Sequence, residues 1–133
     1  MDMQGALRAQ LIADAAVAQL VGQRVHWVDR PQGGELPAVT LQTISAARPR
    51  HMQGLQTLRS SRVQCDIWAE TYKQAREITE AVVAALEPAH TANGISFRPT
   101  GFENERDLME RLAGDTKSIH RTTLDLIVWH SPA

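Results

Sequence analysis

The chain has 133 residues, 43% of them hydrophobic and 22% charged, and its formal net charge is -1. This composition is typical of a globular protein and excludes a disordered chain, and the near-neutral charge gives no overall attraction to nucleic acid or to an anionic membrane. No apolar run approaches the roughly 20 residues that span a bilayer, and the N-terminus lacks the basic start and apolar core of a signal peptide. We therefore expect a single domain over residues 1–133, made in the cytoplasm, with no membrane partner.

The first part of the chain predicts helix followed by a short strand. An apolar stripe and a high alanine content predict a helix over residues 3–21, which Gly22 is well placed to end. Asp14 could instead cap a shorter second helix over Ala15–Val21, which would make this one broken helix. The β-branched and aromatic run Arg24–Val28 then predicts a short strand.

Two alternating stretches predict strands on either side of a long connection. Leu36–Ala46 is the first of them, and it follows Arg30–Gly34, a predicted loop with one proline and two adjacent glycines. The second strand begins at Ser61, and the residues on its apolar face are Val63, Cys65 and Ile67. We interpret Cys65, the only cysteine, as a small buried hydrophobic residue; with no second cysteine, a disulfide within the chain is excluded.

This strand leads directly into a predicted amphipathic helix at about residues 71–87. Thr71 and Gln74 form a capping box, in which the Gln74 side chain would reach back to the Thr71 N–H, and Pro88 cannot continue the helix. The apolar stripe that we expect to be buried consists of Tyr72, Ile78, Val82 and Leu86. Such a helix needs a sheet on which to pack.

The last third of the chain predicts further strands. His90–Gly94 ends in the turn dipeptide Asn-Gly, and a short strand follows at Ile95–Phe97. Residues 103–111 could form a short helix or a strand; we favour the strand, because Gly114-Asp115 is typical of a hairpin turn. Ile119–His130 is the longest β-run, and apolar residues on both faces near its end predict a central or covered strand.

Together these elements predict an α+β fold. We expect a mainly antiparallel sheet of about four to five strands, with the N-terminal helix and the long amphipathic helix (about 71–87) packed on one face.

The segment at about 46–61 stands out by its charge. No acidic residue occurs between Glu35 and Asp66, so a nearly neutral protein has a local positive patch there. We expect a protruding basic loop, formed as a long hairpin connection or as the extended tip of two strands, and we interpret it as a contact surface for a partner. The candidate contact residues are Arg48, Arg50, His51, Met52, Leu55, Leu58 and Arg59. The alternative is a solvated loop with its leucines tucked beneath it.

The sequence offers little for catalysis. It has no nucleophile elbow and no glycine-rich phosphate loop, and no two of its five histidines stand at the i,i+4 spacing that would let both bind one zinc ion from a helix. Asp107 with the later Asp115 and Lys117 loosely matches the carboxylate and lysine arrangement of metal-dependent nucleases. Because Gly114-Asp115 is also explained as a turn, we expect no enzyme activity, no cofactor and no metal.

Four stretches, in this order along the chain, resemble a known family: ADAAVAQLVGQRV (13–25), LPAVTLQTIS (36–45), RVQCDIWAETYKQAREITEAVVAAL (62–86) and ERDLME…HRTTLDLIVWH (105–130). The family is that of the tail-terminator, or tail-completion, proteins of long-tailed bacteriophages and gene transfer agents. The segment that runs into the long helix, R-V-Q-x-D-x-W-A-x-T-Y-x-x-A, is the most specific part.

The resemblance implies a structural protein of the virion, with no catalysis and no cofactor. It implies an α+β subunit that forms a ring with its own copies, usually of six, at the head-proximal end of the tail tube. This ring would end tube polymerisation and join the tail tube protein to a head-completion or neck protein, while DNA passes through the lumen without sequence recognition. The alternatives are a small nucleic-acid-binding adaptor that uses the basic loop and, least favoured, a metal-dependent nuclease.

Overall fold

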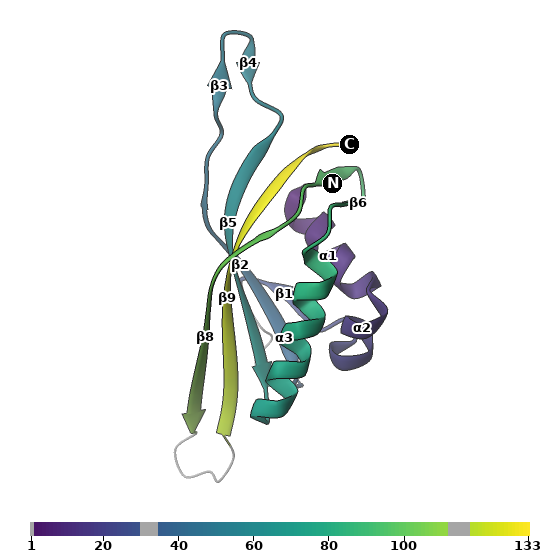
Figure 1. The fold of residues 1–133 in the computed structure, drawn as a ribbon, viewed down its shortest axis with the longest axis vertical. Coiled ribbons are helices and arrows are strands. Elements are labelled where there is room, and N and C mark those ends of the chain that lie inside the picture. The colour runs from purple at the N-terminus through teal and green to yellow at the C-terminus, as the bar shows by residue number, and fades with distance from the viewer. Residues whose placement is uncertain (1, 30–34, 112–117) are drawn as a thin grey trace.

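The computed structural model describes residues 2–29, 35–111 and 118–133. Figure 1 shows three helices packed beside a long, twisted sheet. The helices are α1 (Met3–Ala13), α2 (Ala15–Val21) and α3 (Tyr72–Leu86). The strands are β1 (Val25–Trp27), β2 (Ala38–Ala46), β3 (Arg50–His51), β4 (Gly54–Leu55), β5 (Arg59–Ala69), β6 (His90–Ala92), β7 (Ile95–Phe97), β8 (Gly101–Arg111) and β9 (Ser118–Pro132).

Seven strands form the main sheet, in the order β1-β2-β5-β9-β7-β6, with β8 also paired to β9. Strand β9 is central, as predicted, because it pairs with β5 along one edge and with β8 and β7 along the other. The prediction of a mainly antiparallel sheet of four to five strands is wrong: the sheet is mixed, since β1 runs parallel to β2, and it has more strands. Alternation identifies a strand but not its direction, and three-residue strands are too short to show a period.

The hydrophobic core lies between the helices and one face of the sheet. All three helices and the strands contribute to one cluster of buried side chains, which includes Leu7, Leu11, Val17, Ile78, Val82, Leu86, Val39, Leu41, Val63, Cys65, Ile67, Leu124 and Leu126. Cys65 is fully buried, as predicted. Burial, and then the neighbouring Asp66 carboxylate, raises the pKa of the Cys65 thiol, which keeps it protonated and unreactive.

The N-terminal helix is broken at Asp14, which confirms the alternative to one continuous helix. The Asp14 carboxylate accepts hydrogen bonds from the N–H groups of Ala16 and Val17, both at 3.1 Å, and so caps α2. Gly22 ends α2 with φ +61°, a left-handed value that glycine adopts without strain.

The first turn of α3 differs from the prediction in two contacts. Thr71 caps the helix by accepting from the Gln74 N–H at 3.1 Å, but Gln74 Oε1 accepts from the Glu70 N–H at 3.2 Å rather than from Thr71. Tyr72 is 52% exposed and does not share the buried stripe. At the start of the helix its ring leans toward β8–β9, where its hydroxyl donates to Asp107 at 3.2 Å and its ring centroid lies 6.3 Å from that of His120.

Two antiparallel ladders extend from the helix-covered part of the sheet toward opposite ends of the molecule (Figure 1). At one end, beyond the β2–β5 ladder, the chain forms the separate β3–β4 pair. At the other end, β8 and β9 pair as far as Arg111 and Ser118, which confirms the strand prediction for residues 103–111. The predicted loop at 30–34 and the predicted turn at Gly114-Asp115 lie outside the described residues.

Candidate functional site: a basic hairpin and its surroundings

The β3–β4 hairpin is held by its own backbone. Arg50 pairs with Leu55 and His51 with Gly54, and the Gln56 N–H donates to the Pro49 carbonyl at 2.8 Å. The His51 Nδ1 atom accepts from the Gln53 N–H at 3.1 Å, which fixes the turn. Gly54 has φ +129°, a conformation that side chains rarely adopt. The hairpin is therefore a defined structure with a specific glycine requirement.

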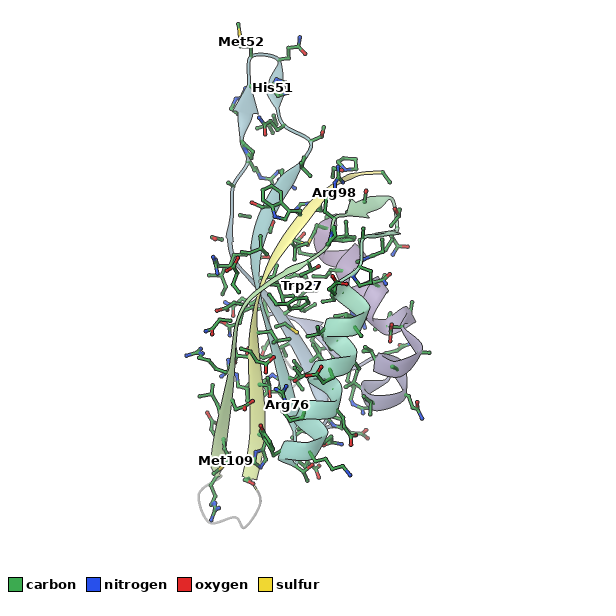
Figure 2. The ribbon with its side chains drawn as sticks, viewed as in Figure 1. Trp27, His51, Met52, Arg76, Arg98 and Met109 are labelled. Carbon is green, nitrogen blue, oxygen red and sulfur yellow. The ribbon has the colours of Figure 1, made fainter. Side chains whose placement is uncertain are left out.

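The apolar residues of the hairpin face water. Met52 at the tip is fully exposed, Leu55 is 50% exposed and Leu58 is 38% exposed. Figure 2 shows Met52 and His51 at the far end of the molecule. An exposed methionine on a rigid support is an adaptable contact for a partner surface.

The arginines of this region form no ion pair with the residues that the structure describes. Arg48, Arg50 and Arg62 are exposed, and none of them forms an ion pair with any other described residue. Arg59 is partly buried and pairs across the ladder with His130. The sequence-level observation of unbalanced positive charge therefore corresponds to exposed guanidinium groups at one end of the molecule.

A hollow of about 360 Å³ lies at the base of the hairpin. Of the candidate contact residues, Arg48, Leu55 and Arg59 line it, whereas Arg50, His51 and Met52 lie beyond it toward the tip. The remaining lining residues are Asp2, Met3, Gln56, Thr57, Ile95, His130, Ser131 and Pro132. The predicted set thus divides into a group at the base of the hairpin and a group at its tip. Leu58 belongs to neither group, since it does not line the hollow and does not lie at the tip.

His130 was not predicted as part of this region. It is buried, and its Nε2 lies 3.1 Å from the Ser61 hydroxyl oxygen. Burial, and then the positive charge of Arg59, lowers the pKa of His130, so the imidazole is neutral at neutral pH. It supports the ladder at the root of the hairpin.

A second polar cluster, also missed from sequence, lies on the sheet face that the helices do not cover. The Asp66 carboxylate is buried and accepts from Thr123 at 2.7 Å, from Arg121 at 2.9 Å and from Gln64 at 3.0 Å. The Arg121 guanidinium lies 4.7 Å from the ring centroid of Trp68. The period-two pattern places Asp66 opposite the core face, but only the pairing of β5 with β9 identifies its partners.

A third cluster joins α3 to β8. Arg76 forms ion pairs with Glu105 at 2.8 Å, with Glu80 at 3.0 Å and with Asp107 at 3.8 Å. The Asp107 oxygens also accept from the hydroxyls of Tyr72 and Thr122. Asp107 is thus held in a structural network.

The nuclease interpretation gains nothing from this arrangement. Asp115 and Lys117 lie outside the described residues. Among the residues that the structure describes, no group of three or more histidine, cysteine or acidic side chains is arranged to hold a metal ion.

The same part of the chain contains no helix that is long and apolar enough to cross a membrane.

Comparison with known proteins assigns the family. The family model described as "Tail completion protein gp17" matches residues 5–131. A chain in the solved structure of the virion of a native gene transfer agent particle is 22% identical, with a TM-score of 0.70 over 97% of this chain and 94% of that one. Another solved structure is 12% identical, with a TM-score of 0.54 over 99% of both chains. At these identities the two structures show the shared fold.

No curated protein matches the chain by sequence. The family model nevertheless spans nearly every element, from α1 through β9. The chain therefore belongs to the family of tail completion proteins, and it has a structural role in a tail of the bacteriophage type.

Proposed function

We propose that this protein is a tail terminator: a ring of its own copies, six in number, that caps the head-proximal end of the tail tube. The observation that carries the proposal is the family match over residues 5–131. Capping would end polymerisation of the tube, and the opposite face of the ring would join the tail to a head-completion or neck protein. The protein would be made in the host cytoplasm and would act in the virion, without catalysis or cofactor.

The shape of the subunit supports this role. Contacts in a ring are heterologous, so each copy needs two different surfaces, one to donate and one to receive. The β3–β4 hairpin and the β8–β9 ladder extend in opposite directions from the helix-covered core (Figure 1). DNA would pass through the lumen without sequence recognition, in keeping with the near-zero net charge.

Deletion of the gene in a producing strain tests the function. Without a cap, tube growth has no stop, so electron micrographs should show tails of irregular and excessive length and heads without tails. Complementation with the intact gene should restore uniform tails joined to heads. Uniform, joined tails in the deletion strain would contradict the proposal.

The contact role of the basic hairpin is a separate proposal. Arg48 and Arg50 are exposed and free of ion pairs with the described residues, so reversing their charge should leave the fold intact. We expect Arg48→Glu/Arg50→Glu to melt within a degree or two of the wild type but to fail to cap tails. Reversal of Arg106 is the control, because Arg106 is also exposed and free of ion pairs with the described residues but lies on β8, the strand that extends to the opposite end of the molecule (Figure 1). Normal tail lengths and infectious or transducing particles from the double variant would refute this role.

The nucleic-acid adaptor is the second candidate, because the same exposed arginines could meet DNA phosphates. It predicts binding of duplex DNA by the isolated protein that weakens steeply as salt is raised. A capping defect with no measurable DNA binding would favour the terminator.

A further inference from the structure

A groove of about 290 Å³ separates α3 from β8, at a distance from the basic hairpin. Its floor is apolar: Val83 and Phe102 are half-buried and pack on the core, and Leu124 is buried. Its rim carries three exposed carboxylates, those of Glu80, Glu103 and Glu105. A β-bulge between Phe102 and Asn104 interrupts the pairing of β8 with β9 at this point.

The groove has a surplus of negative charge. Arg76 lies beside it and faces Glu105, Glu80 and Asp107, so this one guanidinium is shared by three carboxylates. Glu103 forms no ion pair within the described part of the chain. Arg106 is the next residue on β8 after Glu105, so it lies on the opposite face of the sheet, where it pairs in register with Thr123. It therefore does not balance the negative charge of the groove.

The β3–β4 hairpin has the complementary properties. It presents an exposed apolar tip, Met52, and two exposed arginines, Arg48 and Arg50, in a segment without acidic residues. Figure 2 shows Met52 at one end of the molecule and Arg76, which forms ion pairs with two carboxylates of the groove, in the opposite half. The hairpin therefore cannot reach the groove of its own chain. Two surfaces that match each other but cannot meet within one copy are suited to a contact between copies.

We propose that the tip of the hairpin of one copy occupies the α3–β8 groove of the next. Met52 then lies on the floor formed by Val83 and Phe102, where its thioether contacts the aromatic ring. Arg50 meets Glu103, and Arg48 meets the rim on the α3 side. This proposal rests on the proposed ring and names the surfaces that build it, since a head-to-tail contact of this kind closes into a ring or continues into a filament.

The size of the contact explains how assembly could be controlled. A hairpin tip of six residues buries far less than the roughly 1,200 Å² of a stable interface. A pair of free copies is therefore held weakly, whereas copies concentrated on a tube end are each held by two neighbours and by the tube.

Disulfide trapping tests the contact directly. In particles from the complemented deletion strain, Met52→Cys/Glu103→Cys should give a ladder of cross-linked multimers under mild oxidation, because the two positions meet between copies. Each single variant should give no ladder, and the buried Cys65 does not interfere. The matched control is Met52→Cys/Arg106→Cys, which moves the second thiol to the opposite face of the same strand.

Charge exchange tests the pairing of Arg50 with Glu103. Arg50→Glu and Glu103→Arg should each lower the fraction of correctly capped tails by roughly two- to fivefold, as expected for loss of an exposed ion pair in a weak contact. The two together should restore capping, which a folding defect would not do. A double variant as defective as either single one overturns the pairing.

The outcomes separate this inference from the proposed function. Particles that contain the double-cysteine variant but give no more multimer than the Arg106 control overturn the hairpin–groove contact and leave the terminator role in place. If the deletion strain makes normal tails, the terminator role fails, and the same cross-linking on the concentrated purified protein decides the contact. A ladder there supports it, and its absence overturns it.

Discussion

Asp66 forms three side-chain hydrogen bonds on the helix-free face of the sheet, so we expect Asp66→Ala to be strongly destabilising. Its carboxylate is only 8% exposed and accepts from Thr123, Arg121 and Gln64. Alanine would leave three donors without their acceptor and the Arg121 guanidinium, itself 28% exposed, without its counter-charge. The strands β5 and β9 would lose the polar link between their outer faces.

The magnitude follows from the burial of the pair. Removing one partner of a buried ion pair costs about 3–5 kcal/mol. Water can reach the partly exposed Arg121, which lowers the expected loss to roughly 2–4 kcal/mol. For a chain of this length, that loss lowers the melting temperature by about 10 °C.

Urea unfolding followed by circular dichroism measures the loss. Asp125→Ala is the matched control: Asp125 lies on the same face of β9, two residues from Thr123, and forms no hydrogen bond or ion pair with any other described residue. We expect the control to change the free energy of unfolding by less than about 0.5 kcal/mol. Equal losses in the two variants would refute the reasoning, because the Asp66 network would then contribute nothing of its own.

Two further predictions concern single side chains. The folded-state pKa of His130 lies below 6.5, so the unfolded chain binds the proton more readily, and the stability that His130 contributes above pH 6.5 is lost as the pH falls. His130→Gln should therefore flatten the fall in unfolding free energy between about pH 7 and 5.5; an unchanged slope would contradict this. Asp14→Ala should cost about 1 kcal/mol, since it uncaps α2, whereas Asp14→Asn should cost much less because asparagine also caps; equal losses in urea unfolding would argue against the cap.

The sequence predicted the elements more reliably than their arrangement. Thr71, Pro88 and the spacing of Ile78 and Val82 define α3 almost to the residue, because local capping and a 3.6-residue period carry that information. Residues 103–111 are all exposed in the structure, and the strand there was predicted from the turn signal that follows them. These features depend on neighbours in sequence.

What could not be predicted depends on partners far along the chain. The parallel pairing of β1 with β2, the exposure of Tyr72 and the contacts of Asp66 and Arg76 each need the tertiary arrangement. For the candidate site, the sequence predicted the charge and the apolar residues of the hairpin. It could not show that Arg48 and Arg59 both line the hollow at the base, while Arg50 and Met52 lie toward the tip.

The central place of β9 has a consequence for the order in which the protein can fold. Arg59 pairs with His130 and Ala69 with His120, so β5 has no partner on that edge until β9 has left the ribosome. Until then, the nascent chain exposes a long strand edge beside a half-built core, a state that is prone to aggregate. Because such distant pairings form slowly, we expect synthesis rate and chaperone supply to limit the yield of assembly-competent subunits.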